Sequence, residues 1–145
     1  MSEMIISSVT TEAEREICYH LRHVVFVEEQ GVPVELEIDE HDAEDAYHFL
    51  GLIDGEPAAT ARICVFGDKA KIQRVVVMKA FRGRNLGRQL MQHLMDFARA
   101  NKLAPQIALD AQTYAVAFYE SLGFETTGEE FDDAGIAHIH MTQPA

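Results

Sequence analysis

The feature that most constrains the fold is a junction between an apolar run and an amphipathic helix. The run "RVVVM" (74–78) leads to the loop "RGRNLG" (82–87), and "LGRQLMQHLMDFARA" (86–100) then places leucines four residues apart. The next apolar run, "PQIALDA" (105–111), predicts a strand parallel to 70–78, because a helix of this length commonly forms the crossover between parallel strands. This unit indicates an α/β (α+β) fold.

The flanking segments predict antiparallel strands and further helices. Thr11 and Glu14 have the spacing of a capping box, so a helix is expected to begin there and to keep one apolar face until Gly31. We expect one domain over 1–145, a mixed and mostly antiparallel sheet with helices on its faces. Its order is β-α-(α)-β-β-β-α-β-α-β, with strands over 3–9, 46–53, 58–66, 70–78, 105–111 and 134–142, and a last helix over 112–124.

The composition argues against several classes of function. Twelve basic and twenty-four acidic residues give a net charge of −12, so nucleic acid and anionic membranes would be repelled. The N-terminus lacks the basic start and apolar run of a signal peptide, and no apolar stretch reaches the length of a membrane span. Cys18 and Cys64 lie in apolar contexts without CxxC spacing, which favours reduced core thiols. A cytoplasmic location is expected.

The charges are unevenly placed along the chain. Five of the twelve basic residues fall between 74 and 88, whereas nine acidic residues and no Lys or Arg fall between 28 and 45. One interpretation is a site for an anion and a separate site for a cation. The other is that each run is a solvated face.

The loop at 82–87 has the chemistry of an anion cradle. A helix N-terminus presents unpaired N–H groups and partial positive charge, which favours phosphate. Gly83 can take a positive φ without strain, and Asn85 is one of the few other residues that tolerate it. The stretch is neither GxGxxG nor GxxxxGK[ST], which excludes the dinucleotide and P-loop motifs. An ordinary surface turn is the alternative.

Two longer stretches resemble the GCN5-related N-acetyltransferase (GNAT) family. They are "IQRVVVMKAFRGRNLGRQLM" (72–91) and "QTYAVAFYESLGF" (112–124). Asn85 stands where the family's acetyl-CoA loop has its middle glycine, and Gln112 stands at an Asn position. The upstream stretch "VFVEEQGVPVELEIDEHDAEDAYHFLG" looks like the ElaA/YjcF-like branch. The matching residues are Arg82, Leu86, Gly87, Ala115, Phe118, Tyr119, Gly123 and Phe124.

This resemblance implies a cofactor and a set of roles. A splayed pair of parallel strands would bind acetyl-CoA, with the backbone of Val75–Val77 along the pantetheine arm and the Val77 N–H polarising the thioester carbonyl. Tyr119 would protonate the leaving CoA thiolate as general acid. The residues implied to contact acetyl-CoA are Val75, Val76, Val77, Arg82, Gly83, Arg84, Asn85, Leu86, Gly87, Arg88, Gln112 and Phe118.

The group that takes the proton from the acceptor amine stays open. No metal is predicted, because the two histidines at 138 and 140 share a strand face but no carboxylate or cysteine spacing completes a site. The candidates for the base are Glu28, Glu29, His48, His138 and Asp110, the first three also being candidates for substrate contact.

The resemblance implies an acetyl-CoA-dependent N-acetyltransferase acting on a primary amine of a small molecule or protein. If the acidic run at 28–45 lines the acceptor side, the acceptor would be cationic. Two alternatives are a non-catalytic acetyl-CoA-binding module and an acyl-homoserine-lactone synthase, which "LRHVVFVEEQGV" (21–32) also resembles. An exposed strand edge would allow a homodimer.

Overall fold

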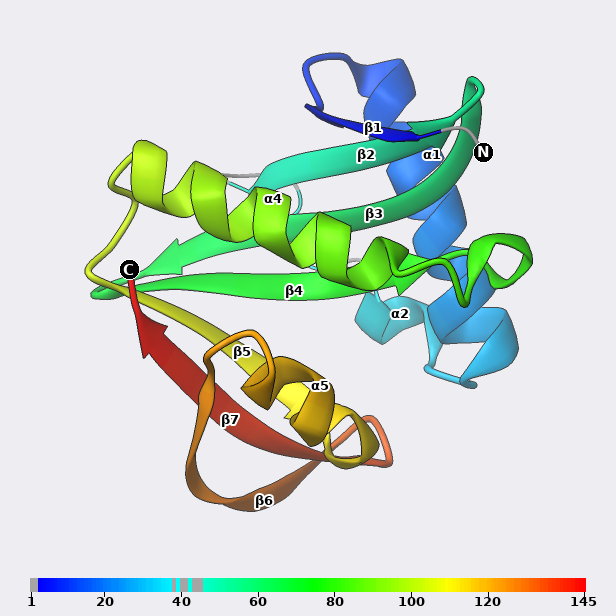
Figure 1. The fold of residues 1–145 in the computed structure, drawn as a ribbon. Coiled ribbons are helices and arrows are strands. Elements are labelled where there is room, and N and C mark those ends of the chain that lie inside the picture. The colour runs from blue at the N-terminus through cyan, green and yellow to red at the C-terminus, as the bar shows by residue number, and fades with distance from the viewer. Residues whose placement is uncertain (1–2, 38, 40–41, 43–45) are drawn as a thin grey trace.

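A computed structural model describes residues 3–37, 39, 42 and 46–145. In this part of the chain one sheet has the strand order β1-β2-β3-β4-β5-β7-β6 (Figure 1). Its strands are β1 (Met4–Ser8), β2 (Tyr47–Ile53), β3 (Glu56–Phe66), β4 (Lys69–Val77), β5 (Gln106–Gln112), β6 (Glu125–Asp133) and β7 (Ile136–Pro144). The helices are α1 (Glu12–Arg22), η1 (His23–Glu29), α2 (Val34–Glu37), η2 (Lys79–Phe81), α4 (Leu86–Ala100), η3 (Thr113–Ala115) and α5 (Val116–Glu120).

The sheet is mixed, as the sequence predicts. All neighbouring strands are antiparallel except β4 and β5, which pair in parallel through the crossover helix α4. Their pairing covers only Lys69–Lys71 with Gln106–Ala108, and the strands then separate. The sheet is therefore divided toward the C-terminal ends of these two strands (Figure 1).

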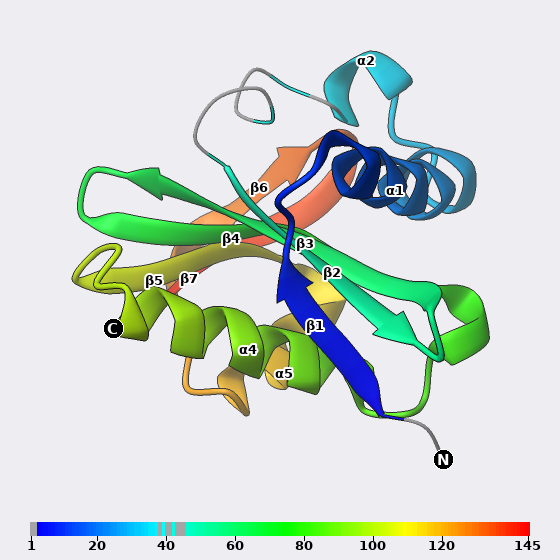
Figure 2. The ribbon, with the colours of Figure 1, turned by 90° about the horizontal axis from the view of Figure 1, so that it is seen from above.

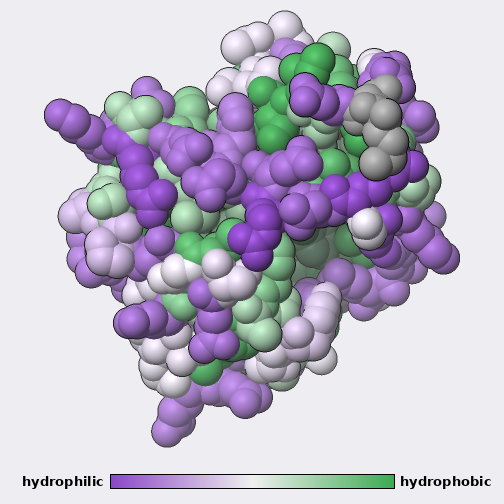
Figure 3. Space-filling view, viewed as in Figure 1, coloured by the Kyte–Doolittle hydropathy of each residue, from purple (hydrophilic) through white to green (hydrophobic). Residues whose placement is uncertain are grey.

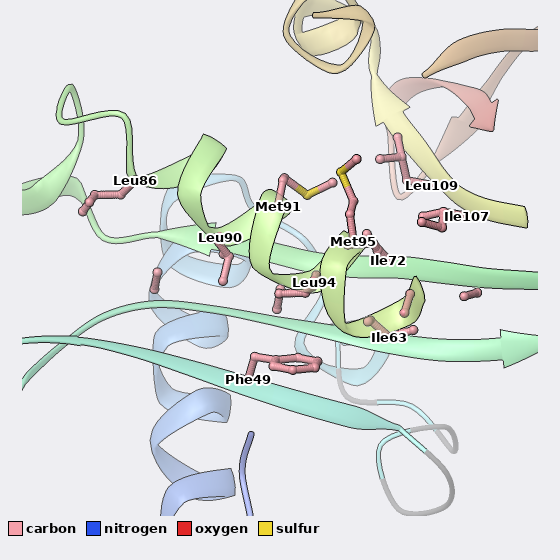
Figure 4. Packing of buried hydrophobic residues seen from close by; sticks show 14 of the residues in the cluster. Phe49, Ile63, Ile72, Leu86, Leu90, Met91, Leu94, Met95, Ile107 and Leu109 are labelled. Atoms are coloured by element: carbon pink, nitrogen blue, oxygen red, sulfur yellow. The ribbon is translucent and has the colours of Figure 1, made fainter. Parts of the chain in front are cut away.

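Helices cover both faces of the sheet. Figure 2 shows α4 and α5 on one face and α1 and α2 on the other. Leu90, Met91 and Leu94 of α4 are completely buried against the sheet (Figure 4). On the opposite face Cys18, Leu21, Val25, Leu50 and Val76 form a smaller buried cluster. Both cysteines are buried free thiols. Among the described residues, no helix has the length and apolarity needed to cross a membrane.

The first helix begins at the predicted capping box and changes from α-helical to π-helical geometry after Arg22. Thr11 and Glu14 form the predicted capping box, with each side chain bonded to the other's backbone N–H. A uniform helix to Gly31 was expected, but residues 23–29 form a π-helix, in which the Gln30 N–H donates to the Val25 carbonyl. The wider turn shifts which side chains face the sheet, and such turns are frequent at functional sites.

Two expectations for the C-terminal region are corrected. β6 was not predicted, because Glu125–Asp133 is acidic, exposed along its whole length and without alternating apolar residues. It is held as an edge strand by antiparallel pairing with β7. The helix predicted over 112–124 is shorter, since Gln112 still belongs to β5 and α5 covers only Val116–Glu120.

A buried ion cluster joins the α1 face to the sheet. Arg22 and Arg62 are each 1% exposed. Arg22 donates to Glu37 and Asp42, and Arg62 donates to Asp39 and lies 2.7 Å from Asp42. The cluster consists of Arg22, Glu37, Asp39, Asp42 and Arg62. Three carboxylates of the acidic run therefore neutralise internal arginines instead of facing an acceptor; Glu40 lies outside the described residues.

We predict that Asp42→Asn destabilises the protein strongly. The variant leaves two buried guanidinium groups without a shared carboxylate, and removing one partner of a buried pair typically costs about 3–5 kcal/mol. Urea unfolding at pH 7 measures the loss. Asp132→Asn on the exposed strand β6 is the control, expected to stay within about 0.5 kcal/mol. Equal stability of wild type and Asp42→Asn would contradict the role of the cluster.

The same variant has a defined pH dependence. Burial would raise the pKa of Asp42, but hydrogen bonds and charge from Arg22 and the hydrogen bond with Arg62 hold it well below its usual value. Because the folded pKa is depressed, the stabilisation is complete above the unfolded pKa of about 3.9 and is lost as the pH falls toward the folded pKa. The gap between wild type and variant should therefore narrow in acid.

Candidate active site

The separation of β4 from β5 exposes a strand edge in the middle of the sheet. Pairing with β5 stops at Lys71, so in the described chain the later residues of β4 face no strand on that edge. The Met78 N–H donates to the Ala58 carbonyl on β3. Since successive amides of a strand point to opposite edges, the Val77 N–H points into the gap. The gap is therefore lined by the backbone of β4 after Lys71, including the Val77 N–H, while the Val77 carbonyl accepts from Arg82.

The loop before α4 has the backbone that the sequence predicts. Asn85 is the N-cap residue with φ 64° and ψ 22°, in the left-handed region, and Gly83 has φ 85°. Asn85 makes no side-chain capping bond, so the first N–H groups of α4 are not covered by it. This arrangement leaves the positive end of the helix dipole open to an anion.

A cavity of about 200 Å³ lies between this loop and α5. Figure 3 shows a hollow with a hydrophobic floor in this region. Arg88 donates to the Ser121 hydroxyl and lies over the Phe118 ring, so it connects α4 to α5. Arg82 donates to the Val77 carbonyl and pairs with Glu29 at 3.0 Å. The cavity is lined by Val77, Arg82, Gly83, Asn85, Leu86, Gly87, Arg88 and Phe118.

The residues predicted to contact the cofactor near this cavity include Val75–Val77 and Arg84, and their side chains point to different surroundings. Val75 and Val77 pack toward the α4 core, whereas the Val76 side chain is buried against α1. Arg84 is exposed and lies over the Phe81 ring, 5.5 Å from its centroid. By the alternation of strand amides, the Val76 backbone also points away from the gap, toward Thr60 on β3, so the prediction that Val76 contacts the cofactor gains no support.

Tyr119 lies where the gap between the strands opens. Its ring packs edge-on against Phe118 and Phe124, and its side chain lines a second cavity of about 190 Å³. Burial, with a smaller effect of Tyr114, raises the pKa of Tyr119 to about 12. The phenol is therefore protonated throughout the neutral range. The sequence could not show this shift, because the packing of Phe118 and Phe124 around the ring is decided by the fold.

The second cavity adjoins a third of about 100 Å³ on the α1 side of the sheet. Their walls come from η1, β4, the end of β5 and the β6–β7 turn. Gln112 donates to the Gln30 side chain across this region. Gln112 therefore closes these cavities on the α1 side from the end of β5. It had been expected to extend from the helix that follows this strand. The residues common to both cavities are Phe26, Gln30, Arg74, Gln112, Asp133 and His138.

Three predicted acceptor residues lie outside both of these cavities. Glu28 is exposed beside His23, and Glu29 pairs with Arg82. His48 is 5% exposed on β2, with its Nε2 atom 3.9 Å from Asp42, and burial lowers its pKa. The strand register turns His48 toward α1 and the ion cluster, away from the gap.

Two predicted base candidates do reach the second cavity. His138 lines it, and its Nδ1 atom lies 2.8 Å from the Ile136 carbonyl. Asp110 contacts Lys71 at 2.6 Å and His140 at 2.7 Å. Burial would raise the pKa of Asp110, but these two partners lower it. His138 therefore contacts a backbone carbonyl, whereas Asp110 is held by two side chains.

Four features of the site were not predicted from the sequence: Lys71, Arg74, Gln30 and the pairing of His140 with Asp110. Alternation along β4 and β5 could have placed Lys71 and Asp110 on one face, but the neighbour of β5 on its other side depends on the β7 register. No group of three His, Cys, Asp or Glu residues in the described ranges could hold a metal ion.

Comparison with known proteins identifies the family. The family model described as an acetyltransferase (GNAT) domain matches residues 11–143. The chain is 37% identical over 132 residues to the uncharacterised N-acetyltransferase YjcF of Bacillus subtilis, covering 90% of this chain and 92% of YjcF. It is 36% identical over 127 residues to ElaA of Escherichia coli, covering 85% and 82%.

Solved structures agree with the sequence matches. The crystal structure of Escherichia coli ElaA superposes with a TM-score of 0.86 at 32% identity, covering 99% of both chains. That of an acyl-CoA N-acyltransferase from Pseudomonas aeruginosa gives a TM-score of 0.88 at 30% identity, again over 99% of both chains. The chain therefore belongs to the GNAT family of acetyltransferases.

Proposed function

We propose that this protein transfers the acetyl group of acetyl-CoA to a primary amine by direct attack on the thioester, within one domain. The observation that carries the proposal is the continuity between the open α4 N-terminus and the gap between β4 and β5. A phosphate at the helix end and an extended arm along β4 would use both features at once. The 200 Å³ cavity lies between them.

The free edge of β4 would position the thioester. The pantetheine amides would pair with the unpartnered backbone groups after Lys71, and the Val77 N–H would donate to the thioester carbonyl oxygen. Attack of the amine places negative charge on that oxygen. A fixed N–H donor stabilises this charge without reorganisation in the transition state.

Tyr119 would return a proton to the CoA sulfur. With a pKa of about 12, its transfer to a thiolate of ordinary pKa 8.5 is unfavourable by about 5 kcal/mol. Burial would also raise the pKa of a thiolate formed beside the Tyr119 ring, which narrows the difference between the two pKa values. Tyr119 would therefore donate its proton while the sulfur leaves, and not to a thiolate that has already formed.

His138 is the proposed base. A carbonyl oxygen only accepts, so the 2.8 Å contact with Ile136 places the hydrogen of neutral His138 on Nδ1 and leaves Nε2 as an acceptor. The acceptor ammonium, with an ordinary pKa near 10.4, must lose a proton before attack, which costs about 4–5 kcal/mol at pH 7. Asp110 is already engaged by Lys71 and His140.

A non-catalytic acetyl-CoA-binding module is the competing function. Release of free thiol from acetyl-CoA in the presence of an amine panel distinguishes the two, because binding alone releases no thiol. No release with any amine, from protein shown by calorimetry to bind acetyl-CoA, would favour the module. Absence of acetyl-CoA binding would reject both.

We predict that the left-handed conformation at residue 85 controls cofactor affinity. Asn85→Gly should bind CoA as wild type does, because glycine adopts φ near 64° readily. Asn85→Val should bind more weakly, because a β-branched residue is strained there by about 1–3 kcal/mol. Calorimetry at low salt measures both affinities. Identical affinities for the two variants would show that CoA binding does not use this conformation.

We predict that Tyr119→Phe lowers kcat by a factor of about a hundred or more, while CoA affinity stays nearly unchanged. The ring contacts with Phe118 and Phe124 survive the substitution, so packing is preserved. Steady-state rates and CoA titrations provide the two readouts. An unchanged kcat, with the chemical step shown to limit turnover, would assign Tyr119 to packing.

We predict that His138→Asn lowers kcat/KM by a factor of about a hundred, because the acceptor amine loses its base. The remaining rate should follow the fraction of free amine in solution. Thr127→Ala, on the neighbouring strand β6, is the control because this residue is exposed, lines neither cavity, and donates its hydroxyl to the His140 carbonyl. A kcat/KM of His138→Asn within a few-fold of wild type would exclude His138 as the base.

A further inference from the structure

A third arginine, Arg74, lies beside the ion cluster and makes its loosest ion pairs. Arg22 takes Glu37 and Asp42, and Arg62 takes Asp39 with both Nη atoms at 2.9 Å. Arg74 donates to the carbonyl oxygens of Glu37 at 3.1 Å and Leu36 at 3.3 Å. Its carboxylate contacts are longer, 3.4 Å to Asp39 and 3.9 Å to Glu37. The Arg74 side chain stays 23% exposed, so it is the arginine of the three that a ligand can reach.

The backbone at Arg74 directs this side chain. Arg74 has φ 57°, which is costly for a residue other than glycine, and the β3–β4 register shifts at this point. Such a bulge re-aims a side chain within a strand. Gln73 bonds to Arg62, while Arg74 lines both of the adjoining cavities on the α1 side. The irregular backbone therefore brings a cation to the region where an acceptor would enter.

The carboxylates around the two cavities have other partners or are exposed. Glu37 lies closer to Arg22 than to Arg74, and Asp110 contacts Lys71 and His140. Asp133 is exposed at the β6–β7 turn, where water screens its charge. Burial, followed by the charges of Arg62 and Arg22, lowers the pKa of Arg74, while Glu37 and Asp39 act in the opposite direction. Gln30 and Gln112 supply neutral polar groups on the opposite wall.

We infer that the acceptor is a small amine that also carries a carboxylate, and that Arg74 binds this carboxylate. The inference rests on the proposed acetyl transfer and names its substrate class. A guanidinium group matches a carboxylate with two parallel N–H donors, and in the described chain the Arg74 Nη1 atom donates no hydrogen bond. With the carboxylate held at Arg74, the amine extends toward Tyr119 and the gap. The acceptor is then zwitterionic or anionic, the reverse of the cationic acceptor that the acidic run suggested.

The test compares matched acceptors. Amino acids with the amine one, two or three carbons from the carboxylate are paired with their carboxamides, and thiol release from acetyl-CoA gives kcat/KM per unprotonated amine. The best acid should exceed its amide by about 10–100-fold, the value of a charge-assisted hydrogen bond. In Arg74→Gln this ratio should fall to about one, while Arg74→Lys keeps part of it. Arg15→Gln, an exposed arginine on α1, should leave the ratio unchanged.

The acid-to-amide ratio of kcat/KM also separates an effect on binding from a folding defect. Arg74 holds two carbonyl groups next to α2, so Arg74→Gln can lower the amount of native protein, but acid and amide are measured on one preparation and that loss cancels. A preference for amines without a carboxylate, or the same ratio in wild type and Arg74→Gln, would overturn the inference and leave acetyl transfer standing. Failure to acetylate any amine, despite acetyl-CoA binding, would overturn both.

Discussion

The early separation of two parallel strands governs the arrangement of this molecule. β4 and β5 exchange contacts over Lys69–Lys71 and Gln106–Ala108 and then part, so a strand edge that would normally be satisfied inside a sheet is left open. Unsatisfied backbone groups are tolerated only where water or a ligand can pair with them. The open edge lies beside the N-terminus of α4, which also has free N–H groups. A cofactor with an extended amide arm and a phosphate group matches both requirements.

The buried ion cluster fixes the other side of this gap. Arg22 from α1 and Arg62 from β3 meet around Asp42, which ties the segment after α2 to the sheet. Buried ion pairs often add little net stability compared with apolar packing, but they are intolerant of misplacement. Glu37 is part of the cluster and its carbonyl also accepts from Arg74. The wall of the third cavity and the core are therefore positioned by the same contacts.

Local sequence signals were reliable for features that depend on a residue and its immediate neighbours in the chain. Asn85 adopts the left-handed conformation, the capping box at Thr11 forms, and the crossover of α4 produces parallel strands. Signals failed where packing by distant segments decides. The edge strand β6 has no apolar alternation and exists through its pairing with β7, and the π-helix after Arg22 depends on contacts that local periodicity does not contain.

The sequence by itself determined the α/β order except for β6, the loop chemistry before α4 and the GNAT resemblance, because these depend on propensities and motifs within short stretches of chain. Only the tertiary structure decided what the charges do. The acidic run could equally have faced solvent or an acceptor, and its Glu37, Asp39 and Asp42 instead neutralise arginines from α1 and β3. Which opposite charges meet depends on strand register and on the packing of segments far apart in the chain, and a one-residue change in register turns a side chain to the other face. For that reason Arg74 was one of five basic residues between 74 and 88 in the sequence, and only the fold shows that it lines a cavity beside the ion cluster.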